Sequence, residues 1–370
     1  MSMINHSVRA FGSPSRYIQG RYVLDELKEY TAPYGKKVFI LVDTFFYGTY
    51  KDKFEKMYDD GENQVIVQEF KGEITVEKID AVYESVKDFQ PDVVAGMGGG
   101  KTMDTAKAVS DKCKAATVII PTTASTDAPT IGLSVIYTAE GEHVGARHYI
   151  KNPDMVLLDT DVIAKAPIRF LVAGMGDALA TYIETRANLE SNSPNYVGKG
   201  FCATVAVEAI AKACHETILK KGVSAKLAAE KGLCTIDVED VIEANTLLSG
   251  LGVQNSSCAG AHSIAEGITV LPPCTKLLHG EVVAFGILVQ LIIEGRCKEE
   301  IKEIYDFFKA VGLPATFEDL GIKDVTSEEI MKVAEESLKS YWDVEPFPVT
   351  AQKIYDAIVM ADILGRKYNK

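Results

Sequence analysis

The chain has 370 residues, of which 47% are hydrophobic and 25% are charged. This length exceeds one average domain, and this composition excludes a disordered chain, a fibre or a small disulfide scaffold. Thirty-nine basic against 52 acidic side chains give a formal net charge of −13, which disfavours binding to nucleic acid or to anionic membranes. We therefore expect a globular protein of two domains with no nucleic-acid or membrane partner.

The cysteines and the apolar runs indicate the environment of the chain. The seven cysteines are odd in number, show no CxxC spacing and lie mostly in apolar stretches. Reduced thiols in a cytoplasmic protein are the simplest account. The longest nearly apolar run, residues 282–293, is shorter than the about 20 residues that a bilayer span needs, so it predicts a buried helix.

The first 160 residues alternate short β-branched runs with amphipathic runs of helix length. Continuous apolar strands separated by helices imply a parallel sheet that helices cover on both faces. The predicted strands are Lys37–Asp43, Gln64–Phe70, 92–97, Ala116–Pro121 and Met155–Asp159. Residues 132–150 interrupt this alternation and predict a hairpin, because two short strand-like runs flank a glycine-containing turn at 138–142.

Helical periodicity replaces the alternation after Ile163 and continues to the end of the chain. The predicted helices are 173–189, 197–219, 224–250, 256–269, 280–294, 298–311, 327–339 and 351–365. We therefore predict an α/β domain over residues 1–162 and an all-helical domain over residues 163–370. A cleft between two such domains is a common place for a ligand.

A glycine-rich loop follows the third predicted strand. Gly98, Gly99 and Gly100 precede Lys101 and a helical pattern. Glycines permit a close backbone approach, and the free amides that open a helix favour an anion, so a pyrophosphate is the expected guest. A tight turn without a ligand is the alternative, because the loop matches neither GxGxxG nor GxxxxGK[ST].

Two further segments lie at the carboxyl edge of the predicted sheet, where open α/β sheets bind ligands. Asp43 ends the first strand, and its carboxylate could accept hydrogen bonds from a ribose diol and repel a 2′-phosphate, which favours NAD over NADP. A solvated turn aspartate is the alternative. The segment 121–127 supplies hydroxyl groups for a phosphate or carboxamide, and Asp127 could bind a hydroxylated substrate.

Two of the six histidines have neighbours that suggest a metal site. His262 lies among small residues in AGAHSI, and His279 directly precedes the apolar run that begins at Val282. Asp177, in GMGDAL, is predicted to open a helix with glycines around it; as a helix cap it would need no metal. Two imidazoles and one carboxylate leave coordination positions open, as catalytic sites do. Zinc suits this set, and iron or manganese are alternatives.

Six motifs together resemble the glycerol dehydrogenases of the metal-dependent, iron-type (group III) alcohol dehydrogenase superfamily. They are GGGKTMDTAKA at 98–108, PTTASTDAPT at 121–130, LSVIY at 133–137, GMGDALATYIE at 174–184, GAHSIAEG at 260–267 and HGEVVAFG at 279–286. The resemblance implies a Rossmann-like α/β domain followed by an all-α domain, which is a dehydroquinate synthase-like architecture. It also implies reversible, NAD- and zinc-dependent oxidation of glycerol to dihydroxyacetone, with other vicinal diols as further substrates. Members of this family are cytoplasmic and form homo-oligomers, often octamers, so the resemblance implies the same for this chain.

The resemblance assigns roles residue by residue. It makes Asp177, His262 and His279 the ligands of one zinc ion per subunit, and it places Asp127 beside the substrate. The positions that match NAD contacts are Asp43, Gly98, Gly99, Gly100, Lys101, Thr122, Ser125, Ile131, Leu133 and Tyr137.

The sequence departs from the wider superfamily at two places. Thr181 stands where iron-dependent relatives place a fourth ligand, a histidine, which argues for three zinc ligands. Ala265 and Glu266 stand where many relatives carry another histidine, so the substrate could differ from glycerol.

Two kinds of alternative remain. One comprises a glycerol-1-phosphate dehydrogenase, a phosphate-binding cyclase or another polyol or hydroxyketone oxidoreductase of the same superfamily. The phosphate-binding enzymes need extra basic residues near the metal, and around Asp127, Asp177 and His262 the sequence has Arg186 and Lys276 but no basic cluster. The other alternative, a non-catalytic NAD-binding protein, predicts loss of metal ligands, and the chain retains all three.

Overall fold

The computed structural model describes residues 8–141 and 143–368. The first seven residues of the predicted α/β domain, Glu142 in the predicted hairpin turn, and residues 369–370 of the predicted helical domain lie outside the described residues.

The chain divides into two compact units. The α/β unit contains residues 12–124 and 128–166. The helical unit contains residues 8–11, 125–127 and 167–368. Two short segments from the predicted first domain thus belong to the helical unit, including the loop that carries Asp127.

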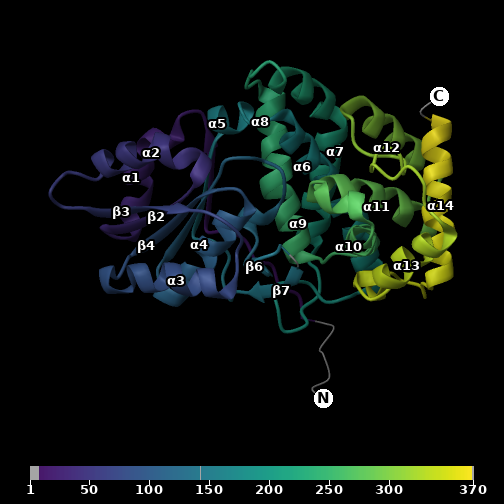
Figure 1. Cartoon of the computed structure of the whole chain (residues 1–370), viewed down its shortest axis with the longest axis horizontal. Helices are drawn as coiled ribbons and strands as arrows, with labels where there is room; N and C mark the ends of the chain where they lie inside the picture. Colours follow the sequence, from purple (N-terminus) through teal and green to yellow (C-terminus); the bar gives the residue numbers. More distant parts are fainter. Residues whose placement is uncertain (1–7, 142, 369–370) are drawn as a thin grey trace. The chain divides into compact units, whose positions relative to one another are not determined.

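In its described residues, the α/β unit holds a six-stranded parallel sheet in the order β1–β8–β5–β4–β2–β3. Helices α2 and α3 lie on opposite sides of the sheet (Figure 1). The strands are β1 Arg16–Gly20, β2 Lys37–Asp43, β3 Gln64–Phe70, β4 Val93–Gly98, β5 Ala116–Pro121 and β8 Met155–Asp159. The helices are α1 Leu27–Thr31, α2 Thr44–Met57, α3 Val76–Val86, α4 Gly100–Cys113 and α5 Thr160–Ala164.

The central strands are buried along their length, as their continuous apolar sequences predict. Every residue of β4 and β8 is buried, and so are the apolar residues of β2 that pack into the same core. Burial on both faces removes the alternation of polar and apolar residues that an exposed sheet shows. The five predicted strands are confirmed, with a shift of one residue in β4.

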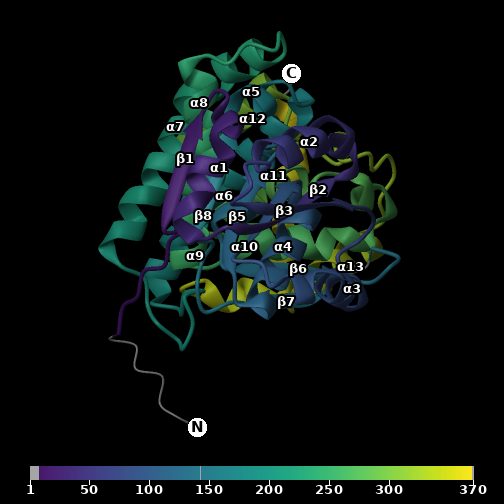
Figure 2. The ribbon, with the colours of Figure 1, turned by 90° about the vertical axis from the view of Figure 1, so that its left-hand side faces the viewer.

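The edge strand β1 was absent from the predicted strands. Its sequence RYIQG is mostly polar and only partly buried, so it lacks the apolar run of the central strands. It pairs in parallel with β8, and Figure 2 shows it at the edge of the sheet. The predicted hairpin is confirmed as the antiparallel pair β6 Leu133–Tyr137 and β7 His143–His148.

The helical unit follows the predicted helical periodicity. Its core includes α11, which is buried along most of its length, as the apolar run from Val282 predicts. The helices are α6 Ile168–Ser191, α7 Val205–Ala229, α8 Ile236–Glu243, α9 Ser249–Asn255, α10 Gly260–Gly267, α11 His279–Ile293, α12 Lys298–Val311, α13 Ser327–Ser337 and α14 Ala351–Tyr368. Among the described residues, no helix combines the length and the hydropathy of a membrane span.

The predicted helices 197–219 and 224–250 are wrong in their bounds. Helix α7 begins only at Val205, because Gly198 and Gly200 have φ angles of 109° and 72° that a helix does not allow. It then continues to Ala229, and Gly232, with a φ of 67°, lies in the turn before α8.

Candidate active site

Three helices of the helical unit bring the predicted metal ligands together. Asp177 lies on α6, His262 on α10, and His279 is the first residue of α11. The Nε2 atoms of His262 and His279 lie 3.5 and 3.4 Å from the same oxygen, Oδ1 of Asp177. One ligand atom from each residue lies within 4.8 Å of the other two. This spacing is compatible with a shared ion.

The prediction that Asp177 opens a helix is wrong. Helix α6 begins at Ile168, so the carboxylate lies inside the helix and does not cap it. Asp177 is only 2% exposed, and its Oδ1 has no hydrogen-bond partner among the residues that the structure describes. A buried carboxylate oxygen without a partner is costly, and a divalent cation between the carboxylate and the two imidazoles would remove that cost. The donor set therefore fits a metal ion.

Close backbone contact places His279 beside Asp177. A Cβ atom on Gly280 would lie 1.8 Å from the carbonyl oxygen of Ala173, and a Cβ on Gly176 would lie 2.3 Å from the carbonyl oxygen of Gly280. Side chains larger than hydrogen would therefore separate α6 from the start of α11. The glycines around Asp177 thus permit helix packing, which the sequence pattern alone did not reveal.

An ion pair holds the first turn of α11. The Glu281 carboxylate accepts a hydrogen bond from the backbone N–H of Leu278 at 2.8 Å. The same carboxylate binds the Arg169 guanidinium with two contacts of 2.6 and 2.7 Å. Because Arg169 belongs to α6, this pair joins the two helices that carry Asp177 and His279.

The electrostatics of the cluster favour positive charge. Burial would raise the pKa of Asp177, but the neighbouring imidazoles of His279 and His262 outweigh burial and hold the pKa below its usual range. Burial would lower the pKa of His262, but the neighbouring Cys258 sulfur and Glu184 carboxylate and the contact with Asp177 raise it well above its ordinary value. A proton or a metal ion bound here would compensate for the negative charge of these carboxylates.

The loop residue Asp127 lies against the same cluster. Its backbone N–H donates a hydrogen bond to Oδ2 of Asp177 at 3.3 Å, and its side chain is half-buried. The structure therefore brings the predicted substrate-binding residue next to a predicted metal ligand.

In the α/β unit, the glycine loop joins β4 to α4. Gly98 ends β4, Gly99 caps α4 and Gly100 begins it. A Cβ on Gly98 would lie 2.7 Å from the Thr102 hydroxyl, whereas Cβ atoms on Gly99 and Gly100 would meet no heavy atom of the described chain within 4 Å. The loop thus leaves open space beside the first amides of α4, and side chains at these positions would occupy that space. Such a site fits the pyrophosphate of a dinucleotide.

The residues around this loop lie as follows. Asp43 ends β2 and caps α2 by accepting a hydrogen bond from the N–H of Phe45 at 2.9 Å. The backbone N–H of Thr122 donates to the carbonyl of Gly98 at 3.2 Å. The Lys101 ammonium forms an ion pair with the Glu73 carboxylate.

The remaining predicted cofactor residues follow β5 in the chain. Leu133 and Tyr137 begin and end β6, and Ile131 lies two residues before this strand. The N–H of Tyr137 donates to the carbonyl of Ile74 at 2.9 Å. Ser125, three residues after Thr122, belongs to the helical unit with Asp127.

Comparison with known proteins identifies the family. The family described as "Iron-containing alcohol dehydrogenase" matches residues 14–160. A glycerol dehydrogenase of Thermotoga maritima is 43% identical, over 95% of this chain and 96% of the relative. The chain belongs to the iron-containing alcohol dehydrogenases.

A solved structure and a second relative extend this comparison. The structure of a probable glycerol dehydrogenase from Sinorhizobium meliloti 1021 has a TM-score of 0.90 and 41% identity, covering 97% of this chain and 99% of that one. A relative named glycolaldehyde reductase, from Halobacterium salinarum, is 38% identical over 96% of this chain and 98% of its own length. The predicted family and fold class are confirmed, and this iron-containing alcohol dehydrogenase is an alcohol oxidoreductase of an NAD-binding, metal-dependent family.

Thr181, at the position where the resemblance led us to expect a fourth ligand in iron-dependent enzymes, carries a buried hydroxyl. The Thr181 hydroxyl lies 2.8 Å from the Ser249 hydroxyl, on a neighbouring helix. Its contact is therefore with another helix of the unit.

Sequence reasoning missed a buried ion pair that fastens the predicted cofactor segments of this dehydrogenase. The Lys107 ammonium binds Oδ1 of Asp104 at 3.0 Å and donates to the carbonyls of Ala128 and Leu133 at 2.7 and 3.0 Å. Oδ2 of Asp104 accepts the N–H of Val135 at 2.9 Å. The motif DTAK could have revealed this pair, because it places opposite charges three residues apart on one face of a helix. Residues 102–110 of that helix, α4, are all buried.

Proposed function

We propose that this chain is an NAD- and zinc-dependent glycerol dehydrogenase, which converts glycerol and NAD+ reversibly to dihydroxyacetone, NADH and a proton. The observation that carries the proposal is the convergence of two imidazole nitrogens on a buried, unpartnered oxygen of Asp177. The names of the full-length relatives support glycerol as the substrate.

The metal centre would use three side chains, Asp177, His262 and His279. Two imidazoles and a carboxylate suit zinc, although iron and manganese accept the same ligand types. When bound, a divalent ion supplies Lewis-acid polarisation that lowers the pKa of a substrate hydroxyl. We assign Asp127, whose backbone contacts Asp177, to a hydrogen bond with a second hydroxyl of the polyol.

The α/β unit would bind the dinucleotide. The amides at Gly99 and Gly100 would hold the pyrophosphate, and the Asp43 carboxylate would accept hydrogen bonds from the ribose diol. A 2′-phosphate would meet the negative charge of Asp43, so we assign NAD as the cofactor. The nicotinamide accepts the hydride, and the protein sets its position and orientation.

An uncharged polyol suits the charges near the metal ligands better than a phosphorylated one. Arg186 forms an ion pair with Glu300 at 2.7 Å, and Arg169 is paired with Glu281. Neither guanidinium is therefore free of a carboxylate. A glycerol-1-phosphate dehydrogenase is the weaker candidate for this reason.

A small hydroxyaldehyde is the second candidate substrate. The relative named glycolaldehyde reductase covers nearly the whole chain at 38% identity. Reduction of such an aldehyde gives a primary alcohol of a vicinal diol, whereas the proposed oxidation acts on a secondary alcohol. Both reactions transfer a hydride between nicotinamide and a carbon that bears a hydroxyl or carbonyl oxygen, so the same residues would serve both. A cytoplasmic location and a homo-oligomeric state stay predictions, and light scattering of the purified protein would test the latter.

A substrate panel with metal removal tests the proposed function. The enzyme is assayed with glycerol, 1,2-propanediol, 2,3-butanediol and glycerol 1-phosphate in the presence of NAD+ or NADP+, and with glycolaldehyde in the presence of NADH or NADPH. The assays are repeated after chelation and after addition of zinc, iron or manganese. We expect glycerol with NAD to give the highest kcat/KM, and zinc to restore activity. An unchanged rate after complete metal removal would contradict the proposal.

A further inference from the structure

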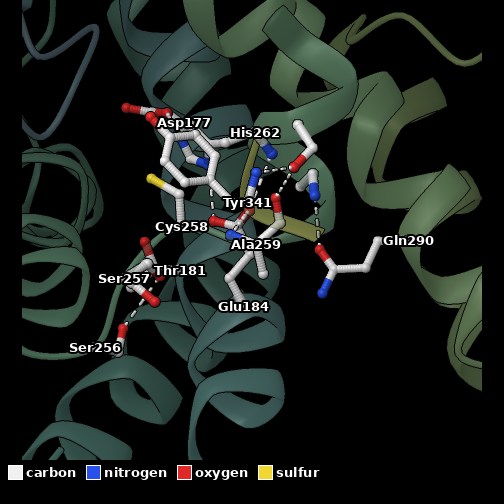
Figure 3. A network of polar contacts seen from close by, with 12 residues as sticks. Asp177, Thr181, Glu184, Ser256, Ser257, Cys258, Ala259, His262, Gln290 and Tyr341 are labelled. Atoms are coloured by element: carbon white, nitrogen blue, oxygen red, sulfur yellow. Dashed lines mark hydrogen bonds and ion pairs between the residues drawn. The ribbon is translucent and has the colours of Figure 1, made fainter. Parts of the chain in front are cut away.

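Glu184 lies behind the metal cluster and is fully buried. It belongs to α6, seven residues after Asp177, so both acids lie on the same face of that helix. Figure 3 shows its carboxylate among the polar groups that connect α6 to α10. Glu184 is not among the site residues predicted from the sequence.

The Glu184 carboxylate accepts three hydrogen bonds. Oε2 lies 2.7 Å from Nδ1 of His262. Oε1 accepts the backbone N–H groups of Ala259 and His262 at 2.8 and 2.9 Å (Figure 3). These contacts hold both the ring and the backbone of His262, and they compensate for burying an ionised carboxylate.

The direction of these hydrogen bonds determines which ring nitrogen is free. A carboxylate only accepts hydrogen bonds, so Nδ1 of His262 must carry the proton. In the neutral ring Nε2 then has a lone pair, and Nε2 is the atom that faces Asp177 at 3.5 Å.

We propose that Glu184 is a positioning residue that fixes His262 in the tautomer and orientation required for Nε2 to bind the divalent cation. Glu184 acts through the imidazole and does not ligate the ion. This inference rests on the proposed metal centre, and it adds a residue that determines the affinity of that centre. Hydrogen-bonded partners of this kind typically change metal affinity by about 10–100-fold.

A different arrangement would use the other side of the ring. Glu184, Cys258 and His262 also lie close enough for one ligand atom of each to share an ion. In that arrangement Glu184 and the thiolate would be ligands. The 2.7 Å contact between Oε2 and Nδ1 is a hydrogen bond and favours the positioning role.

The substitution Glu184→Gln tests the proposal at nearly constant volume. A glutamine has one oxygen and one NH2 group, so it cannot accept from both backbone N–H groups and from Nδ1 together. If its oxygen caps the backbone, its NH2 group donates to Nδ1 and forces the proton onto Nε2.

Gln290→Leu provides the matched control. The Gln290 side chain is also buried on α11 and accepts the N–H of Ala261 at 2.8 Å, so it too caps the start of α10. It makes no contact with the His262 ring in the described structure. A purely structural role for Glu184 predicts that both variants weaken zinc binding to a similar degree.

Zinc affinity of the full-length apoprotein is measured by competition with a chromogenic chelator, with urea unfolding and NADH binding in parallel. We expect Glu184→Gln to raise the zinc Kd about 10–100-fold, with NADH binding unchanged and with Gln290→Leu near the wild-type Kd. Equal zinc affinity in Glu184→Gln and wild type would overturn the positioning role while leaving the metal centre intact. Failure of the wild type to bind zinc would instead overturn the centre itself.

Two further measurements keep the inference testable if Glu184→Gln does not fold. Glu184→Asp keeps the charge with a shorter reach, and wild-type zinc affinity in this variant would contradict the proposal. Cobalt substituted for zinc in the wild type reports thiolate ligation as an intense near-ultraviolet band. We expect that band to be absent, and its presence, together with its loss in Cys258→Ser, would establish the alternative arrangement.

Discussion

The glycine loop of the α/β unit and the metal cluster of the helical unit are built in opposite ways. The loop comes from one continuous segment, in which Gly98 ends a strand and Gly100 begins a helix. The metal cluster comes from three helices that are far apart in the chain. A local segment can be assembled by backbone preferences alone, whereas the cluster exists only when the helices pack.

Each of the two regions also buries a carboxylate, and the two carboxylates have different partners. Asp104 in α4 is paired with the Lys107 ammonium and accepts a hydrogen bond from the N–H of Val135 in β6. Glu184 in α6 has N–H donors only and holds His262. Each carboxylate contacts a residue or segment that is predicted to bind a ligand: Asp104 contacts β6 on the cofactor side, and Glu184 contacts His262 on the metal side. The comparison can therefore be tested by changing each region separately.

Replacing His262 with alanine should have the largest effect, and only on the metal side. Loss of Lewis-acid assistance worth several kcal/mol corresponds to a fall of about a thousandfold or more in kcat/KM for glycerol. NADH binding, measured by fluorescence titration, should stay within about twofold of wild type because the glycine loop is unchanged. Normal zinc content and turnover in this variant would show that His262 is not a ligand.

Replacing Lys107 with methionine tests the other buried charge. The change leaves Asp104 buried without a cation, which should lower the free energy of unfolding by about 3–5 kcal/mol. The loosened 128–135 segment should also raise the Kd for NAD, whereas the zinc Kd should not change. The double variant Asp104→Asn/Lys107→Met should recover part of the stability in urea unfolding. If the single variant is as stable as wild type, the ion pair does not fasten this segment.

Two glycine substitutions separate packing from ligand space. Gly280→Ala should lower the free energy of unfolding by about 1–3 kcal/mol and weaken zinc binding, because its Cβ would lie 1.8 Å from the Ala173 carbonyl. Gly100→Ala meets no described atom within 4 Å, so its stability should stay within about 0.5 kcal/mol of wild type. Its KM for NAD should nevertheless rise several-fold. Wild-type NAD kinetics in Gly100→Ala would argue against a pyrophosphate at this loop.

The smallest expected effect concerns a buried acid outside both sites. Burial, with the negative charges of Glu294 and Glu184, raises the pKa of Glu345 from 4.5 to about 8. Between these values the folded state holds a proton that the unfolded state releases, so the free energy of unfolding falls as pH rises. Glu345→Gln does not titrate and should be relatively more stable at high pH.

Urea unfolding of both proteins at about pH 7 and about pH 8 measures this difference. We expect the advantage of Glu345→Gln to grow by roughly 1 kcal/mol between the two conditions. Parallel pH dependences for the two proteins would show that Glu345 ionises normally in the folded state.

The sequence predicted the α/β unit well because its signals are local. Continuous apolar runs identified five strands, and three glycines after β4 identified the loop. The edge strand β1 escaped prediction because a half-exposed strand carries no apolar run. The bounds of α7 were missed because periodicity continued through Gly198 and Gly200, whose positive φ angles interrupt the helix.

The candidate metal site was predictable only in part. Residue types and the family resemblance selected Asp177, His262 and His279, and the structure brings all three together. The same reasoning placed Asp177 at a helix start, whereas it lies inside α6, and it overlooked Glu184. The surrounding glycines looked like a helix boundary, but their function is to let α6 and α11 touch.

By itself, then, the sequence determined the strands, the glycine loop and the helical character of the second unit, since each depends on neighbours within a few residues. Tertiary structure decided which oxygen of Asp177 the two imidazoles share, and which carboxylate orients His262. Those contacts join residues on different helices, and their geometry depends on how closely the backbones approach. The distance between two helix backbones cannot be read from the spacing of residues along the sequence.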